Sequence, residues 1–189
     1  MNLEKFTDRA KGFLQAAQTV AIRNSHQRIS PEHILKALLD DEQGMASGLI
    51  NAAGGDARRA NAETDAALAK VPAVSGSGAQ QTPGLDNDAV RVLDSAEQVA
   101  QKAGDSFVTV ERLLLALTLA TTTTAGKALA TAGVRAEALN GAIKECVAAI
   151  NAKVMRKIGA SRAELLETLD QPALKALPAK PYEYAEWKR

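Results

Sequence analysis

An internal repeat is the feature of this sequence that most constrains its fold. Residues near the N-terminus recur 79 positions later without a gap, and the similarity persists over about 50 residues of each copy. The matched pairs include Ala10 with Ala89, Leu14 with Leu93, Ala17 with Ala96, Val20 with Val99, Glu32 with Glu111, Leu35 with Leu114, Leu38 with Leu117, Gly54 with Gly133 and Asn61 with Asn140. The chain is therefore expected to contain two copies of one unit, packed around a shared core.

Each copy is expected to consist of four helices, because its apolar residues recur at spacings of three and four. The first stripe comprises Phe6, Ala10, Phe13, Leu14, Ala17, Val20 and Ala21, and the second comprises Leu85, Ala89, Val92, Leu93, Ala96, Val99 and Ala100. Aromatic residues make up only 3% of the chain, so aliphatic residues must fill the core, and Ala and Leu favour helix. We predict an all-α fold with repeats at 1–70 and 85–150, joined by a linker at 71–84 that is rich in Pro, Gly and Ser.

Helix ends are marked at equivalent positions of the two copies. Thr7 and Asp86 are candidate N-caps, and Ser30-Pro31-Glu32 matches Thr109-Val110-Glu111, with proline at the favoured first helical position. Gly54 and Gly133 are expected to end the third helix of each copy in the left-handed conformation.

The chain continues past the second repeat. An eighth helix is predicted over about residues 136–158, ended by Gly159, and Ser161 with Glu164 predicts a capping box for a short ninth helix ending near Pro172. Beyond it, the prolines and the aromatic residues Tyr182, Tyr184 and Trp187 predict an extended tail.

Charge and cysteine content limit the function classes. With 23 basic and 22 acidic residues, the chain has no global field that would attract nucleic acid or an anionic membrane. The N-terminus lacks the apolar core of a signal peptide and no apolar run approaches a membrane span, so a cytoplasmic protein is expected. His26 and His33 are too few for a metal site, and Cys146, within an apolar helical run, is predicted to be a small core residue rather than a nucleophile.

No enzymatic constellation is found. Ala125-Gly126-Lys127-Ala128 is the nearest approach to a phosphate-binding loop, but that motif needs glycine at Thr121 and a hydroxyl at Ala128. We therefore expect no catalysis, no metal, no cofactor and no small-molecule substrate.

The segments MNLEKFTDRA, His26–Leu39, Val71-Pro72 and Gly104–Leu117 resemble, in order and spacing, the N-terminal (Clp repeat) domain of the ClpB/Hsp100 disaggregase family. The resemblance covers about residues 1–145. It implies a pseudo-twofold pair of four-helix repeats that recognises unfolded or aggregated polypeptides. Without the oligomerising ATPase modules of that family, a monomer is expected.

The same resemblance implies that Thr7, Asp105 and Glu111 bind substrate beside an apolar groove between the repeats. Each residue also has a structural interpretation. Thr7 can be an N-cap, Asp105 can hold the turn before a helix, and Glu111 can stabilise the first turn of one. The sequence leaves the two interpretations open.

Residues 150–189 resemble a stretch downstream of the catalytic core in IstA-type insertion-sequence transposases, through the pattern S-R-x-E-L, P-A-L-K-x-L-P and P-Y-x-Y-A-E-W. The stretch carries none of the acidic residues that would hold catalytic metals. A truncated chaperone fused to a transposase-like tail at 151–189 is the simplest explanation. The alternative function is a non-catalytic, nucleic-acid-associated fragment, but the tail's basic residues form a weak stripe.

Overall fold

The structure is a computed structural model that describes residues 3–74 and 82–174. By the density of its contacts the chain divides into two units, Met1–Lys144 and Glu145–Arg189. The predicted aromatic segment with Tyr182, Tyr184 and Trp187 lies outside the described residues.

The first unit contains the predicted repeats. The elements of the first repeat are η1 (Leu3–Lys5), α1 (Asp8–Arg23), β1 (Arg28–Ile29), α2 (Pro31–Leu39), α3 (Met45–Ala52) and α4 (Ala57–Leu68). Those of the second are β2 (Gly84–Leu85), α5 (Asn87–Lys102), α6 (Val110–Leu119), α7 (Thr124–Thr131) and α8 (Ala136–Ala152). The four helices of the second repeat begin 79 residues after their counterparts in the first, so the predicted pair of four-helix repeats is confirmed.

The caps explain why the helices begin at equivalent places. The Thr7 hydroxyl accepts a hydrogen bond from the Ala10 amide at 3.3 Å, and Asp86 accepts one from the Ala89 amide at 2.6 Å. Each side chain satisfies one of the amides that a helix leaves unpaired at its start, a contribution of about 1 kcal/mol. The helix ends are equally alike, because Gly54 and Gly133 have φ angles of 81° and 82°.

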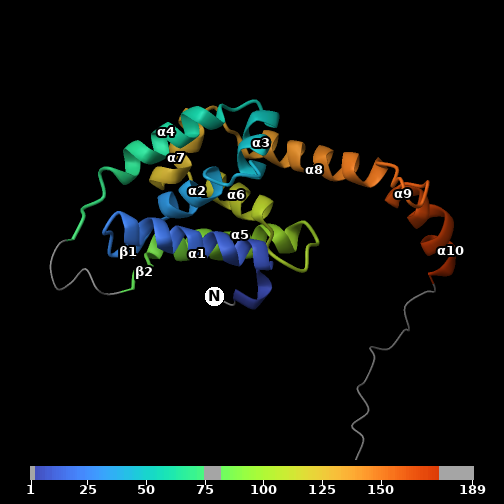
Figure 1. The fold of residues 1–189 in the computed structure, drawn as a ribbon, viewed down its shortest axis with the longest axis horizontal. Helices are drawn as coiled ribbons and strands as arrows, with labels where there is room; N and C mark the ends of the chain where they lie inside the picture. Colours follow the sequence, from blue (N-terminus) through green and yellow to red (C-terminus); the bar gives the residue numbers. More distant parts are fainter. Residues whose placement is uncertain (1–2, 75–81, 175–189) are drawn as a thin grey trace, which may run out of the picture. The chain divides into compact units, whose positions relative to one another are not determined.

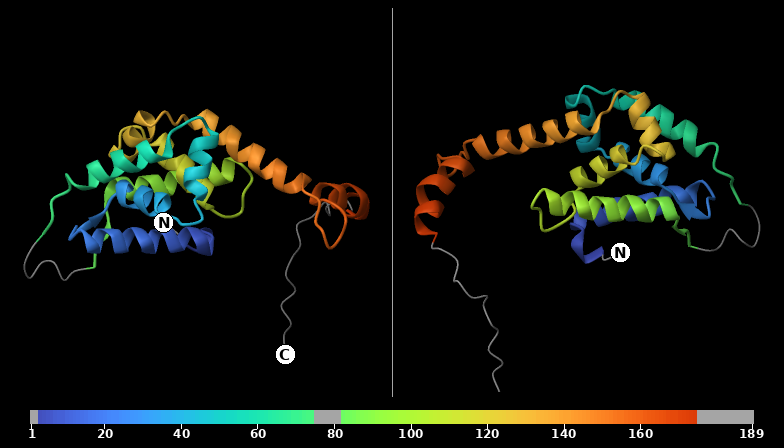
Figure 2. Two further views of the ribbon diagram at one scale, coloured as in Figure 1. Left: turned by 45° about the horizontal axis from the view of Figure 1, so that its top comes forward. Right: turned by 180° about the vertical axis from the view of Figure 1, so that it is seen from behind.

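Helices α2 and α6 form the centre of the first unit. In Figure 1 they lie between a layer of α1 and α5 and a layer containing α3, α4 and α7, and Figure 2 shows the same order from behind. All of α2 except Lys36 is buried. The largest fully buried side chains of the unit are Phe6, His33, Ile34, Leu35, Leu38, Ile50, Leu93, Leu113, Leu114, Leu117, Leu129 and Leu139.

Two short β contacts join the repeats, and sequence reasoning missed both. Strand β1 pairs in parallel with β2, with Ile29 opposite Leu85, and an isolated parallel bridge joins Phe6 to Val108. Because Phe6 and Leu85 are equivalent, as are Ile29 and Val108, one contact is the symmetry counterpart of the other. Each of the two contacts therefore pairs a segment of one repeat with a segment of the other.

The predictions for the segment after the repeats are partly wrong. Helix α8 ends at Ala152, not near Ile158, and Gly159, with φ 75°, lies in a later turn. From Lys144 to the helix end every residue of α8 is exposed, so no core contact supports further turns. For the same reason Cys146 is exposed and is not the core residue that we predicted.

The ninth helix is confirmed in outline. Ser161 and Glu164 form the predicted capping box, with the Ser161 amide donating to Glu164 at 2.6 Å. Helical structure continues through α9 (Arg162–Leu165), a π-helical segment η3 (Leu166–Asp170) and α10 (Gln171–Ala173). This part of the chain has almost no buried side chains, so local capping rather than a core defines it.

Candidate functional site

The bridge between Phe6 and Val108 brings together the segments that carry the three predicted site residues. The Thr7 amide donates to the Val108 carbonyl oxygen at 3.1 Å, and the Val108 amide donates to the Lys5 carbonyl oxygen at 2.7 Å. Asp105 and Glu111 lie three residues before and three residues after Val108. The structure thus gathers Thr7 and the 105–111 segment around one contact between the repeats.

The contacts of each predicted residue bear on its structural interpretation. Thr7 caps α1 through its hydroxyl. Asp105 accepts a hydrogen bond from the Arg112 guanidinium at 2.6 Å, a half-exposed ion pair. Glu111 is half-buried in the first turn of α6 and makes no hydrogen bond or ion pair with the residues that the structure describes. Of the three, only Glu111 has no hydrogen bond or ion pair among the described residues, so its whole carboxylate can accept from a partner.

Phe107 is a residue of this region that sequence reasoning did not single out. Its side chain is 53% exposed although the next residue, Val108, is buried in the bridge. Leu3, close in sequence to the other side of the bridge, is 44% exposed. An aromatic residue in a turn just before a helix N-cap, outside any apolar stripe, was the available signal.

An apolar groove lies between the repeats. It has a volume of about 360 Å³ and is lined by Leu3, Lys11, Leu14, Gln15, Gln18, Ile29, Pro83, Gly84 and Leu85, so α1 and β1 face the start of the second repeat across it. Thr7, Asp105 and Glu111 do not line this groove. Leu3 belongs both to the groove and to the Phe6–Val108 region.

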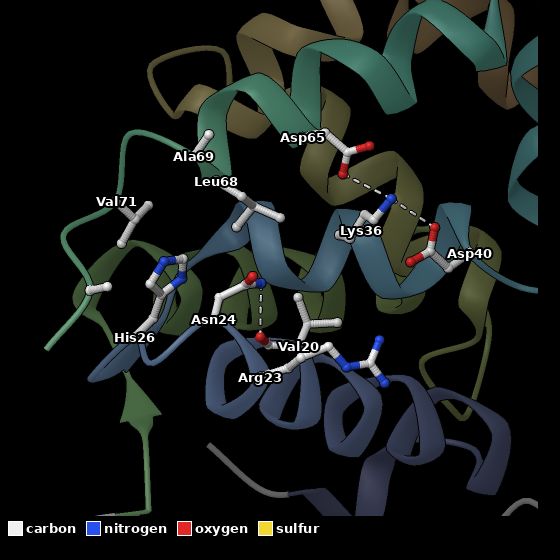
Figure 3. Close-up of a pocket in the computed structure, with 11 residues that line it drawn as sticks. Val20, Arg23, Asn24, His26, Lys36, Asp40, Asp65, Leu68, Ala69 and Val71 are labelled. Carbon is white, nitrogen blue, oxygen red and sulfur yellow. Dashed lines mark hydrogen bonds and ion pairs between the residues drawn. The ribbon is translucent and has the colours of Figure 1, made fainter. Parts of the chain in front are cut away.

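A second, polar cavity lies at the other end of α1 (Figure 3). Lys36 crosses it and contacts Asp65 at 2.8 Å and Asp40 at 2.9 Å. Burial alone would lower the pKa of Lys36, but the bonds to Asp65 and Asp40 outweigh burial and raise it. Because two carboxylates hold the Lys36 ammonium in its charged form, the cavity offers no reactive amine.

His26, which lines this cavity, belongs to a buried chain of hydrogen bonds. The Ser30 amide donates to His33 Nδ1 at 3.0 Å, which leaves the proton on His33 Nε2, and that atom lies 2.8 Å from His26 Nδ1. His26 also bonds the backbone of Val71. Burial is the main cause that lowers the pKa of His33 to about 4, and burial also lowers that of His26.

The histidine pair is the symmetry counterpart of an ion pair. His26 and His33 stand 79 residues before Asp105 and Arg112, and both pairs join the turn before a helix to the helix's first turn. One repeat therefore uses a neutral, fully buried pair where the other uses a charged, half-exposed pair. The repeat offset was the available sequence signal for this relation, but we considered the histidines only as metal ligands.

Residues 3–74 and 82–174 lack two further features. They contain no group of three or more His, Cys, Asp or Glu side chains placed to hold a metal ion. No single helix there is long and apolar enough to cross a membrane, and α6 and α7 reach that length only as a pair bent by 92°.

Comparison with known proteins gives consistent results. The family described as Clp repeat (R) N-terminal domain matches residues 5–132. The chaperone protein ClpB of Rhodopseudomonas palustris is 54% identical over 143 residues, which cover 76% of this chain and 16% of the relative. The chain thus spans about one sixth of the length of such curated relatives.

Solved structures support the fold. The Hsp104 N-terminal domain from Candida albicans superimposes with a TM-score of 0.62 at 21% identity, covering 73% of this chain and 88% of that one. A ClpV N-domain in complex with a VipB peptide superimposes with a TM-score of 0.56 at 21% identity, covering 72% of this chain and 83% of that one.

Proposed function

Because this chain belongs to the family of Clp repeat N-terminal domains, we propose that it is the polypeptide-binding module of a ClpB-type chaperone and recognises unfolded or aggregated proteins. The related ClpV N-domain was solved with a peptide, which supports this class of ligand. The proposal concerns the module alone, and its binding is proposed to need neither nucleotide nor catalysis.

The observation that carries the proposal is exposed apolar surface at the junction of the repeats. Phe107 and Leu3 are about half exposed, and Leu3 leads into the apolar groove lined by Leu14, Ile29 and Leu85. Unfolded chains differ from folded ones in presenting apolar side chains beside unpaired backbone groups. A groove of this kind would bury such side chains, whatever the sequence that carries them.

The expected affinity is weak. If an extended segment buried about 200 Å² of apolar surface, the gain would be about 5 kcal/mol, and the loss of freedom on docking would offset most of it. Weak, sequence-tolerant binding suits a module that presents clients and releases them.

We propose that Thr7, Asp105 and Glu111 contribute polar contacts beside this surface. Glu111 is the strongest candidate, because its carboxylate is half-buried and unpaired among the described residues. A carboxylate there would favour segments with a backbone amide or a basic side chain next to an apolar one, and would disfavour acidic segments.

Titration of the chain against a reduced and alkylated globular protein, which stays unfolded, tests the proposal. Phe107→Ser and Glu111→Gln should each weaken binding several-fold without changing the free energy of unfolding by more than about 0.5 kcal/mol. Glu137→Gln is the matched control, because Glu137 lies exposed in the first turn of α8. Equal binding by all three variants would refute the assignment of the site.

Thr7→Ala and Asp105→Ala separate the remaining interpretations. If they lose binding only in proportion to lost stability, capping and the Arg112 ion pair account for these residues. If binding falls while stability holds, they contact substrate.

The alternative, a nucleic-acid-associated fragment, is not favoured by the relatives of the first unit. The resemblance of residues 150–189 to IstA-type transposases remains a prediction. A genomic neighbour that carries the rest of such a transposase would support it.

A further inference from the structure

A groove in the second repeat corresponds to the polar cavity of the first repeat. It has a volume of about 650 Å³, compared with about 390 Å³ for the polar cavity, and lies among helices α5, α6 and α8. Its lining includes Val99 and Lys102, the counterparts of Val20 and Arg23 in the polar cavity. We call it the α5–α8 groove. We propose that it binds an extended segment of a partner protein that carries acidic and aliphatic side chains.

Three exchanges between the repeats give the α5–α8 groove its apolar character. In the polar cavity Lys36 pairs with Asp40 and Asp65 (Figure 3). The residues that stand 79 positions later are Leu115, Leu119 and Lys144, and all three line the groove. The ion pairs of the first repeat are thus replaced by aliphatic side chains and a lysine, and Leu119 is left 48% exposed.

The first repeat also shows how a chain segment occupies this position. The residues after α4 form one wall of the polar cavity, where Ala69 and Val71 line it (Figure 3). This segment is held by a hydrogen bond that the Val74 amide donates to the Ser25 carbonyl oxygen at 2.9 Å. In the second repeat the corresponding residues 148–152 remain in helix α8, so the wall has no counterpart. An extended segment from another protein would take its place.

A free backbone acceptor stands where such a segment would bind. Gly104 is the counterpart of Ser25, and both residues have a left-handed backbone conformation, with φ angles of 79° and 56°. The backbone therefore turns in the same sense in both repeats. The Ser25 oxygen accepts from Val74, whereas the Gly104 oxygen accepts no hydrogen bond from a described residue. It can accept one from a backbone amide of an extended ligand, the kind of bond that gives affinity whatever the ligand sequence.

Unpaired lysines define the charge of the ligand. Lys102 at the end of α5 and Lys144 on α8 are exposed, and neither forms an ion pair or hydrogen bond with a described residue. Arg112 also lines the groove but is paired with Asp105. Glu137 stands seven residues before Lys144, about 10 Å along the helix axis, so it is not a counter-ion for that lysine. Acidic side chains of a ligand would therefore meet cations without partners.

The two surfaces of the first unit should differ in the charge that they prefer. The surface with Phe107 and Glu111 is proposed to disfavour acidic segments, whereas the α5–α8 groove would favour them. Thr7, Asp105 and Glu111 do not line the groove. The contact is therefore additional to the proposed function and can be tested separately from it.

Fluorescence anisotropy with the whole chain measures the predicted binding. The probe is a short labelled peptide of alternating valine and glutamate, compared with a matched peptide in which lysine replaces glutamate. Lys144→Glu should weaken binding of the glutamate peptide about tenfold, because an attraction becomes a repulsion, and Leu119→Ser should weaken it about threefold. Neither change should unfold the chain, since both side chains are exposed. Binding of the glutamate peptide should also fall as salt is raised.

Lys127→Glu is the matched control for charge. Lys127 is an exposed residue of α7 that does not line the groove, so its reversal changes the net charge equally and should leave the affinity for the glutamate peptide unchanged. Phe107→Ser should also leave this affinity unchanged. Amide chemical shifts of Ala103, Gly104 and Leu119 should move when the glutamate peptide is added.

Three results would overturn the inference. If Lys144→Glu and Leu119→Ser fold as the parent does and bind the glutamate peptide equally well, the groove is not its site. If the parent binds the glutamate peptide no better than the lysine peptide, the lysines do not select acidic segments. If a single-stranded oligonucleotide binds in place of the glutamate peptide and Lys144→Glu abolishes that binding, the lysines contact phosphate groups instead.

Discussion

Acidification should destabilise this fold through the buried histidine pair. In the folded chain His33 is fully buried and accepts a hydrogen bond from the Ser30 amide, so it binds a proton only near pH 4. In the unfolded chain an ordinary histidine binds a proton near pH 6.5. The unfolded state therefore takes up more protons between these values, and stability falls as the pH is lowered.

The size of the effect follows from the two pKa values. At pH 5 the unfolded His33 is almost fully protonated and the folded one is not, so about 2 kcal/mol of the free energy of unfolding should be lost relative to pH 8. Below pH 4 the loss would approach about 3.4 kcal/mol. His26 acts in the same direction, while Asp86, whose pKa is raised, acts in the opposite direction as it becomes protonated in the folded state.

Urea denaturation followed by circular dichroism at several pH values measures this loss. His33→Asn provides the control, because an amide oxygen can accept from Ser30 but does not titrate; the variant should be less stable at neutral pH and should lose most of the dependence between pH 6.5 and 5. An NMR titration of the histidine ring protons in the parent gives the pKa values independently. A folded-state pKa above 6 for His33, or an unchanged pH dependence in the variant, would refute the reasoning.

Three further outcomes are expected. Gly126→Ala should lower the free energy of unfolding, measured by urea denaturation, by about 1–3 kcal/mol, because the added Cβ would overlap the Ala120 carbonyl group. Gly12→Ala, with open space around it, should instead stabilise helix α1 by about 0.5–1 kcal/mol. Equal effects of the two substitutions would contradict this packing. Asp86→Ala should cost about 1 kcal/mol and Asp86→Asn much less by the same assay, since asparagine preserves the cap, and equal losses would show that the charge matters more. Cys146 should react with iodoacetamide in the folded chain as fast as an exposed thiol. Slow reaction of the Cys146 thiol would show instead that it is buried, as we predicted from the sequence.

Local signals in the sequence were sufficient for most of the fold. The apolar stripes, the caps at Thr7 and Asp86 and the glycines at 54 and 133 each depend on a few neighbouring residues, and the structure confirms all of them. The end of α8 was not predictable in this way. Its length depends on whether tertiary contacts continue along it, and an apolar run around Cys146 does not say whether anything covers it.

The site residues Thr7, Asp105 and Glu111 stay a prediction. The contact of Thr7 with the 105–111 segment depends on the Phe6–Val108 bridge, which joins residues far apart in the sequence through backbone atoms and so leaves no pattern in the side chains.

The exchange of strand contacts between the repeats has a consequence for how such a fold can be divided. Ile29 and Phe6 belong to one repeat but form no strand pairing with each other; each pairs with the counterpart of the other in the second repeat. A single repeat thus contains both kinds of strand segment but does not pair them with each other. Two identical copies could pair them twice around a twofold axis, so the fused chain is the covalent form of what one repeat could build only as a homodimer.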